Sequence, residues 1–388
     1  MNITDSIKYV GVNDKDLDLF ESQYILENGI AYNSYVIMDK KIALMDTVDI
    51  RGLEQWVANL DRALEGRDVD YIVVQHVEPD HSGALVYALE KYPNAIIVGN
   101  SKTFVYLQQF FDVDISNRKL EVKEGDELSL GTHTLSFIMA PMVHWPETMV
   151  TYDSVDKVLF SADGFGKFGT LDTDEDWACE ARRYYFNIVG KYGASVQMLL
   201  KKAKTLDIQK ILPLHGPILE ENLGYYIDLY DKWSSYTPEN KGVYIAYASI
   251  HGNTKKVAEI LADKIHALGE EKVVVADLSR EDIAECVEDA FRYDRMILCS
   301  ATYDGNAFVP MEDFLHHLQI KAFQNRTVGL VENGTWAPMA AKAMRNYLDT
   351  MKNITVLDEV VSIKSSYKAE NEESMNQLAQ AIVNASNM

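Results

Sequence analysis

The hydrophobic pattern is most regular from Gly242 onward, where short apolar runs alternate with amphipathic stretches. The runs at 243–249, 272–278, 295–301, 327–333 and 355–363 are almost continuously apolar, which is typical of parallel strands buried on both faces. Apolar residues recur at helical spacing in the stretches 254–269, 281–291, 310–320, 337–352 and 373–386. Five strand–helix units in succession predict a doubly wound open sheet.

The chain before residue 237 has a different pattern, in which short strand-like runs occur in groups. The runs at 34–39, 41–46, 71–76, 95–100, 135–140, 149–153, 157–163 and 210–215 indicate a mixed sheet. Helical stretches at 51–66, 81–93 and 175–206 are expected to cover its faces and to complete a layered α/β domain. The polar segment 237–242 contains both proline and glycine, so we place the linker there and predict domains at 1–240 and 241–388.

Length and composition fit two domains of an ordinary soluble protein. The 388 residues are 47% apolar and 25% charged, and no apolar run approaches the roughly 18 residues that a membrane span needs. The N-terminus lacks the features of a secretory signal, and Cys179, Cys286 and Cys299 are not spaced as CxxC. We therefore expect a cytoplasmic protein without disulfides or an iron–sulfur cluster. A net charge of −22 without a basic aromatic cluster disfavours nucleic acid as a partner.

Seven candidate metal ligands follow four of the apolar runs, and four of the seven lie within the six residues 76–81. They are His76, Glu78, Asp80, His81, His144, Asp163 and His215. A single buried histidine is more often part of a hydrogen-bonded core, but polar residues at the carboxyl ends of strands converge on one edge of a sheet. Imidazole and carboxylate without thiolate suit iron, manganese or zinc, and three carboxylates with a hydroxide neutralise two divalent cations. We expect a dinuclear site in which Asp163 is the bridge.

Three polar loops follow strands of the second pattern. The loop 249–254 combines small, hydroxyl-bearing and glycine residues before a helix, which lets backbone N–H groups close around a phosphate. The same residues would also serve as a simple helix N-cap. The loops 302–306 and 333–336 each place an aromatic residue, Tyr303 or Trp336, beside a glycine, so the two rings are candidates to flank a flat ligand. The alternative is a set of surface turns with partly buried aromatic residues.

The pattern HxExDH, followed by a later His, then Asp, then His, resembles the metal site of metallo-β-lactamase-fold proteins. Those hydrolases usually carry His where this chain has Glu78, and a hard anionic ligand there favours iron over zinc. The ligand spacing and the flanking segments HWPETM, SADGFGKFG, EARRYYFNIVGKYG and PLHGP are similar to those of the flavodiiron proteins. The resemblance implies two iron ions, the first held by His76, Glu78 and His144, the second by Asp80, His81 and His215, and both by Asp163.

The second domain resembles flavodoxin, in which flavin mononucleotide (FMN) binds at the switch point between the first and third strands. No GxGxxG motif follows a strand, which disfavours a dinucleotide. The implied fold class is α/β, with an N-terminal metallo-β-lactamase-like αββα sandwich and a C-terminal flavodoxin-like, doubly wound parallel five-stranded sheet. The residues implied in FMN binding are Ser249, Ile250, His251, Gly252, Asn253, Thr254, Thr302, Tyr303, Asp304, Gly305, Asn306, Asn333, Gly334, Thr335 and Trp336.

The resemblance also implies an activity, that of an FMN- and diiron-dependent oxidoreductase. Members of the family pass electrons from an external donor through FMN to a non-haem diiron site and reduce dioxygen to water, nitric oxide to nitrous oxide, or both. Because the sequence ends without a cysteine-rich domain, we expect an outside donor such as rubredoxin or its reductase. We also expect a head-to-tail homodimer or a dimer of dimers. Two alternatives stay open, a zinc hydrolase of the metallo-β-lactamase fold and a flavodoxin-type electron carrier whose metal domain is inactive.

Three aromatic residues lie near the candidate ligands or the family's loops in the sequence. Tyr24, Trp145 and Phe165 are candidates for tuning the choice between dioxygen and nitric oxide, although packing is the commoner role of such side chains. The sequence does not decide the preferred gas, the identity of the donor, or dimer versus tetramer.

Overall fold

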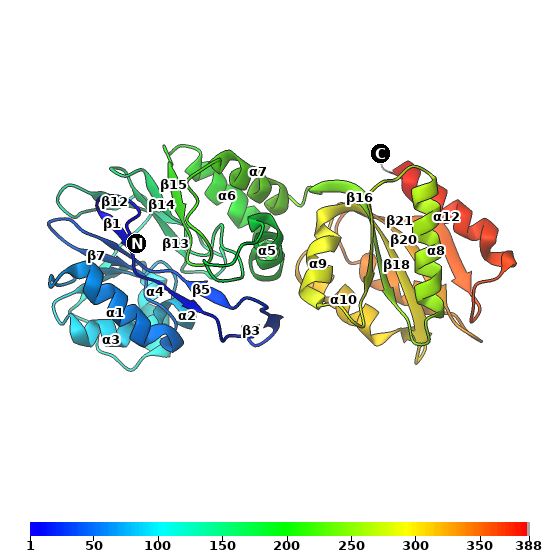
Figure 1. Cartoon of the computed structure of the whole chain (residues 1–388), viewed down its shortest axis with the longest axis horizontal. Coiled ribbons are helices and arrows are strands. Elements are labelled where there is room, and N and C mark those ends of the chain that lie inside the picture. Colours follow the sequence, from blue (N-terminus) through cyan, green and yellow to red (C-terminus); the bar gives the residue numbers. More distant parts are fainter. Residues whose placement is uncertain (386–388) are drawn as a thin grey trace. The chain divides into compact units, whose positions relative to one another are not determined.

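A computed structural model of the chain describes residues 1–385, which form two compact units (Figure 1). The first unit contains Met1–Tyr185 and Ala194–Asp231, and the second contains Phe186–Gly193 and the chain from Lys232 onward. The segment 186–193 belongs to the second unit because Phe186 stacks on Phe291 there, with ring centroids 4.2 Å apart. The division into domains at 1–240 and 241–388 stays a prediction.

Two β-sheets form the centre of the first unit, and their inner faces share one apolar core. A six-stranded sheet has the order β1-β6-β7-β8-β9-β10 and a five-stranded sheet the order β11-β12-β13-β14-β15. The core combines side chains such as Met45 and Val73 of the first sheet with Phe137 and Phe160 of the second, all of them fully buried. The strands of the first sheet are β1 (Ile7–Tyr9), β6 (Tyr35–Ile37), β7 (Ala43–Met45), β8 (Tyr71–Val73), β9 (Ile96–Gly99) and β10 (Lys119–Glu121); those of the second are β11 (Glu127–Ser129), β12 (Thr134–Met139), β13 (Met149–Asp153), β14 (Val158–Phe160) and β15 (Lys210–Leu212).

Helices cover the outer faces of both sheets, so the predicted αββα sandwich is confirmed (Figure 1). Helices α1 (Leu53–Leu64), α2 (Pro79–Ser82), α3 (Leu85–Lys91) and α4 (Ser101–Phe110) lie beside the first sheet, and α6 (Gly193–Ala203) and α7 (Leu223–Ser234) beside the second. Two short pairs of strands add a flap to the unit: β2 (Val12–Asp14) with β5 (Ile30–Tyr32), and β3 (Leu19–Phe20) with β4 (Tyr24–Ile25). A short turn of 3-10 helix, η1 (Ile50–Gly52), precedes α1.

The helix predicted at 175–206 is interrupted. It consists of α5 (Trp177–Tyr184), a π-helical turn (η2, Tyr185–Val189), a 3-10 turn (η3, Gly190–Tyr192) and α6. The hydroxyl of Tyr236 donates a hydrogen bond to the Gly190 carbonyl oxygen at 2.8 Å. This hydrogen bond lies at the 3-10 turn that separates the π-helical turn from α6.

The second unit is built on five parallel strands in the order β17-β16-β18-β20-β21, which confirms the predicted doubly wound sheet. The strands are β16 (Asn240–Ala248), β17 (Val273–Asp277), β18 (Tyr293–Tyr303), β20 (Arg326–Asn333) and β21 (Ile354–Ile363), and a two-residue strand, β19 (Asn306–Ala307), pairs antiparallel with the end of β18. The helices are α8 (Asn253–Ala267), α9 (Ile283–Arg292), α10 (Val309–Ile320), α11 (Ala340–Leu348) and α12 (Glu372–Asn384), with a 3-10 turn, η4 (Ala369–Asn371), before α12. Ser386, the end of the last predicted helix, lies outside the described residues.

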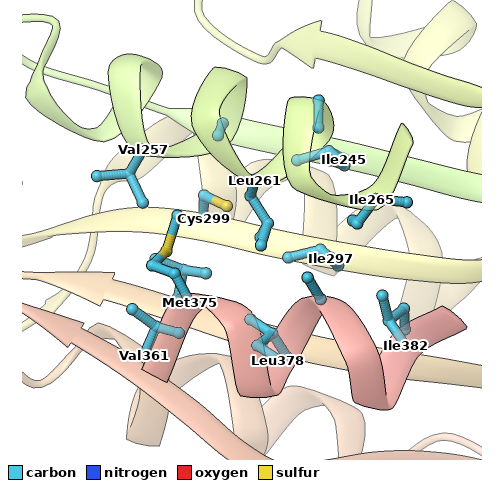
Figure 2. Close-up of a cluster of buried hydrophobic side chains, with 14 of the residues drawn as sticks. Ile245, Val257, Leu261, Ile265, Ile297, Cys299, Val361, Met375, Leu378 and Ile382 are labelled. Carbon is cyan, nitrogen blue, oxygen red and sulfur yellow. The ribbon is translucent and has the colours of Figure 1, made fainter. Parts of the chain in front are cut away.

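Helices α8 and α12 pack on one face of this sheet, as Figure 2 shows. Leu261 of α8 and Leu378 of α12 meet Ile297 and Cys299 of the central strand β18, and all four are fully buried. Burial of a leucine side chain contributes about 1.5–3 kcal/mol. The apolar residues of the two helices therefore determine which face of the sheet they cover. The polar loops lie outside this packing, at the carboxyl ends of the strands. No helix among the described residues is long and apolar enough to cross a membrane.

Candidate metal and flavin sites

The seven predicted metal ligands come together at the ends of strands in the first unit. His76 follows β8, Asp163 follows β14 and His215 follows β15, while His144 lies between β12 and β13. Strands β14 and β15 are parallel neighbours, so their carboxyl ends bring Asp163 and His215 to the same edge. The short helix α2 starts with Pro79 and holds Asp80 and His81 at successive positions. The sequence prediction of one converging site agrees with this geometry.

Four of the side chains form a first group of possible metal ligands. The Nε2 atoms of His76 and His144 lie 3.1 and 3.0 Å from Oε2 of Glu78. The same two nitrogens lie 3.3 and 3.2 Å from Oδ2 of Asp163. Ligand atoms about 3 Å apart surround one point at the distance at which histidine and carboxylate bind a divalent metal.

The other three side chains form a second group. Oδ2 of Asp80 lies 3.3 Å from Nε2 of His81 and 3.2 Å from Nε2 of His215. The second oxygen of Asp163, Oδ1, lies 3.1 Å from Nε2 of His81 and 3.8 Å from Nε2 of His215. Asp163 thus presents one oxygen to each group, as a bridging carboxylate must.

The ligand atoms of the second group have no hydrogen-bond partners, although they are buried. Within residues 1–385, no hydrogen-bond partner of suitable geometry reaches either carboxylate oxygen of Asp80, Oδ1 of Asp163, or Nε2 of His81 and of His215. Unsatisfied buried polar atoms cost free energy, and a native structure keeps them where a ligand satisfies them. The residues therefore fit a pair of divalent metals with histidine and carboxylate ligands.

The charges of the site are strongly coupled. Burial lowers the pKa of His144, but the hydrogen bonds and charges of Asp163 and Glu78 outweigh it and raise the pKa to about 9. Burial also raises the pKa of Asp163, but the neighbouring imidazoles of His81 and His76 outweigh it and hold the pKa well below its usual range. Because metal ligands must be deprotonated, metal binding at these histidines is expected to release protons.

Sequence reasoning missed the groups that orient these ligands. The Nδ1–H of His76 donates to Oε1 of Glu147 at 2.8 Å, and Nδ1 of His215 donates to the carbonyl oxygen of Ala31 at 2.8 Å. Glu147 is completely buried and also accepts the backbone N–H of Val77 at 2.9 Å. The segment HWPETM contains Glu147, but nothing in the sequence says that its carboxylate turns back onto His76.

Asp46 supports the loop that carries the ligands. Its carboxylate accepts the backbone N–H of Gln75 at 2.8 Å and the side-chain amide of the same residue at 2.9 Å. Burial raises the pKa of Asp46 to about 6. The sequence contained a signal for this residue, since Asp46 follows an apolar run.

The three aromatic candidates lie around the site in different ways. The Trp145 ring meets the His76 ring edge to face, with centroids 5.2 Å apart. Phe165 stacks on Tyr230 at 4.1 Å, and the buried Tyr24 packs near Phe168 at 6.1 Å. Trp145 therefore contacts a ligand, whereas the contacts of Phe165 and Tyr24 are with other aromatic rings.

Two further aromatic residues wall the second metal group. Phe20, at the tip of the flap, and Tyr184 of α5 lie 5.4 and 5.6 Å from the His215 ring. Burial and the nearby carboxylates of Asp163, Asp80 and Glu78 hold the pKa of Tyr184 well above its usual value, so its hydroxyl keeps its proton.

In the second unit, the three predicted loops surround a pocket of about 640 Å³. Thirteen of the fifteen predicted residues line it; Gly252 and Asn306 do not. Gly252 instead precedes α8 with a φ of 83°, and its N–H donates to the Ser249 hydroxyl at 3.1 Å. The pocket thus opens at the N-terminal end of a 15-residue helix, where backbone N–H groups attract a phosphate.

The pocket walls fit a flat aromatic ligand. Tyr303 is 46% exposed and Trp336 is 91% exposed, although both line the pocket, so a stacked ring would cover them. A Cβ on Gly334 would lie 2.9 Å from Cα of Pro338, which explains glycine in that loop. Sequence reasoning missed Ala301, Ala337, Met339 and Ser365, of which Ser365 comes from a loop after the last strand.

Comparisons with known proteins agree with both halves of the chain. Residues 30–216 match a family model described as ODP family beta lactamase, and residues 244–376 match a flavodoxin domain. An uncharacterized protein of Methanocaldococcus jannaschii is 30% identical and covers 95% of this chain and 94% of its own length. The anaerobic nitric oxide reductase flavorubredoxin of Vibrio vulnificus is 33% identical over 80% of this chain, which spans 65% of the length of that relative.

A solved structure extends the likeness to the whole chain. Rubredoxin oxygen:oxidoreductase from Desulfovibrio gigas superposes with a TM-score of 0.93 at 25% identity, covering 100% of this chain and 98% of its own. The fold, the two family models and the relatives therefore lead to the same assignment. This chain belongs to the flavodiiron protein family and is an oxidoreductase.

Proposed function

We propose that this chain is a flavodiiron reductase that passes electrons from an external donor through FMN to two irons and reduces dioxygen to water, nitric oxide to nitrous oxide, or both. The observation that carries the proposal is the pair of ligand groups that share Asp163, one on each carboxylate oxygen. A flavin-sized pocket in the second unit supplies a place for the electron carrier. The relatives named as a nitric oxide reductase and as an oxygen oxidoreductase support both gases.

The same observations count against the two alternatives. A zinc hydrolase does not need a flavin, so it leaves the flavin-sized pocket unexplained. Glu78 also places a hard anionic ligand where hydrolases of this fold usually carry histidine. An electron carrier with an inactive metal domain would be expected to have lost at least one ligand, yet all seven side chains converge. The reductase accounts for both sites.

In this proposal the bound flavin and irons supply the electron transfer and the reduction of the gas. The seven residues of the two ligand groups would hold the irons. The carboxylate of Glu147 orients the ring of His76 by accepting a hydrogen bond from its Nδ1–H. Phe20, Tyr184 and Trp145 place apolar ring surface beside the ligands and so limit the access of water. The loops of the second unit would hold FMN, and the backbone N–H groups at the N-terminus of α8 would attract its phosphate.

The two sites also suggest the partners of the chain. The Desulfovibrio gigas relative is a rubredoxin oxygen:oxidoreductase, which supports rubredoxin as the donor, with a rubredoxin reductase as the second candidate. The exposure of Trp336 at the flavin pocket supports a head-to-tail dimer, or a dimer of dimers, in which a second copy covers the flavin. The buried free thiols of Cys286 and Cys299 support a cytoplasmic location.

Metal and flavin analysis of the purified protein tests the proposal. We expect about two irons and one FMN per chain, and consumption of dioxygen or nitric oxide when a rubredoxin and its reductase supply electrons. Steady-state rates with each gas then give the preference. Zinc without flavin would falsify the reductase and restore the hydrolase. Proteolysis near 237–242 followed by separate analysis of the fragments tests whether 1–240 holds the iron and 241–388 holds FMN.

A further inference from the structure

A largely apolar cavity of about 140 Å³, partly open to solvent, lies in the first unit between the five-stranded sheet and the two helices that cover it. Leu159 of β14 and Ile211 of β15 form its floor, and Leu200 of α6 and Ile227 of α7 belong to the covering helices. Lys204 is the only lining residue with a polar side chain among the part of the chain that the structure describes. Apart from Lys204, the lining offers a polar ligand no side-chain hydrogen bond in exchange for its lost hydration.

The two floor residues of the cavity lie on the same strands that precede two of the metal ligands. Leu159 and Ile211 are register partners on the parallel strands β14 and β15. Each precedes a ligand by four residues, Asp163 on one strand and His215 on the other. Four residues span at most roughly 13 Å, and the chain turns after β14 and after β15, so the floor of the cavity lies nearer than that to both ligands. The cavity is therefore separated from the metal site by about one layer of side chains.

Phe165 belongs to that layer. It lines the cavity and lies two residues beyond Asp163, in the loop that carries this bridging ligand. Its φ of 67° is unusual for a bulky residue, and two contacts with Tyr230 hold it there: the rings stack at 4.1 Å, and the Phe165 N–H donates to the Tyr230 hydroxyl at 2.6 Å. The backbone of Phe165 is thus strained, and its ring is held in place by stacking at the point where the cavity meets the ligand loop.

The size and chemistry of the cavity select its occupant. An apolar cavity of about 150 Å³ in another protein stays dry and binds xenon or benzene. Dioxygen and nitric oxide are small, weakly polar molecules that partition into apolar space, and they can enter this cavity from its open side. We propose that this cavity binds the diatomic gas substrate and delivers it past Phe165 to the metal site. The delivery role rests on the proposed function, but binding of an apolar gas does not.

Xenon tests binding without any reaction. Crystals of the protein loaded with FMN and iron are pressurised with xenon, and the anomalous signal is compared with that of unpressurised crystals. We expect a xenon atom between Phe165, Leu200 and Ile211. Absence of xenon from this cavity, with xenon bound elsewhere in the same crystal, overturns the proposal.

Filling the cavity tests delivery. Ala203 lines the cavity at the end of α6 and is half-buried, so Ala203→Phe introduces a ring into the space. Ala194→Phe makes the same change at an exposed position of the same helix and is the control. Leu206→Phe enters the cavity from the following loop and serves as a second variant if Ala203→Phe folds poorly.

The readout is the second-order rate at which the reduced protein reacts with each gas. We expect Ala203→Phe to lower this rate at least roughly threefold by raising KM while leaving kcat, iron content and FMN content unchanged, and Ala194→Phe to lower none of them. Equal gas rates in all variants overturn delivery through the cavity. Xenon in the cavity of a protein that consumes neither gas would instead overturn the proposed function and leave the gas-binding cavity standing.

Discussion

The metal site and the flavin pocket are built on opposite principles. In the metal site the side chains of His76, Glu78 and Asp163 are 0, 15 and 1% exposed, and their orientation is set by buried hydrogen bonds. In the flavin pocket, Trp336 is 91% exposed and the loops rely on glycine turns and backbone N–H groups.

The contrast follows from the charge of what each site holds. Buried carboxylates and imidazoles are costly unless every partner is in place, so the metal site has to be preformed around its ligands. A flavin has a large apolar ring surface and a phosphate. Its pocket therefore needs only a complementary shape and backbone N–H groups that donate hydrogen bonds to the phosphate. Changes at the metal site should therefore have large effects, and changes at the flavin pocket small ones.

The largest effect is expected for Asp163→Asn, because Asp163 faces both ligand groups. Loss of one partner from a buried charge cluster costs about 3–5 kcal/mol, or roughly 10²- to 10⁴-fold in metal affinity. We expect both irons to be lost, which iron analysis per chain measures. FMN content should stay at the unmodified level; a fall in FMN as well would indicate misfolding instead.

A smaller loss is expected for His215→Ala, because His215 lies only in the second ligand group. Its Nε2 lies 3.2 Å from Oδ2 of Asp80 and 3.8 Å from Oδ1 of Asp163. His215 is not a member of the first ligand group, which contains Glu78 and His144. Iron analysis should give about one iron per chain in place of about two. If Asp163→Asn and His215→Ala both retain full iron, the assignment of ligands is wrong.

Glu147→Gln should weaken the metal site without removing a ligand. Burial raises the pKa of Glu147, but the hydrogen bond and charge of His76 outweigh it and hold the pKa below its usual value, so the carboxylate is ionised and orients the ring. Loss of such a partner costs about 10- to 100-fold in metal affinity. Competition with an iron chelator and the reduction potential of the diiron site measure the change.

Thr148→Val is the matched control for Glu147→Gln. Thr148 is the next residue and equally buried, but its hydroxyl has no hydrogen-bond partner. The control should retain the chelator resistance and the potential of the unmodified protein. An unchanged potential in Glu147→Gln would show that Glu147 only fills space.

The smallest effect is expected for Trp336→Ala at the flavin pocket. Loss of one stacked aromatic ring costs about 1 kcal/mol, or roughly a fivefold higher Kd for FMN. Because the side chain is 91% exposed, the Tm of the flavin-free protein should not change. Fluorescence titration of flavin-free protein with FMN measures the Kd, and Val309→Ala, also exposed but outside the pocket, should leave it unchanged. A hundredfold loss of affinity would mean that the pocket depends on its side chains as strongly as the metal site does.

Much of the fold and of both sites could be predicted from the sequence, because these features depend on residues that are close together in the chain. The apolar runs of β16, β18 and β20 need burial on both faces, which leaves only a sheet with helices on both sides. The six residues 76–81 place four ligand-type side chains after a strand, whatever the rest of the chain does. Glycine at 305 marks a turn with a φ of 77° for the same local reason.

Tertiary structure alone decided the features that depend on distant partners. Nothing local shows that Glu147 reaches His76, that the carbonyl oxygen of Ala31 orients His215, or that Ser365 completes the flavin pocket. The helix predicted at 175–206 is interrupted, and the Tyr236 hydroxyl donates a hydrogen bond to the Gly190 carbonyl oxygen at the interruption. Periodicity records which face of an element is buried, whereas a hydrogen bond between residues 46 or 71 positions apart forms only after the chain has folded.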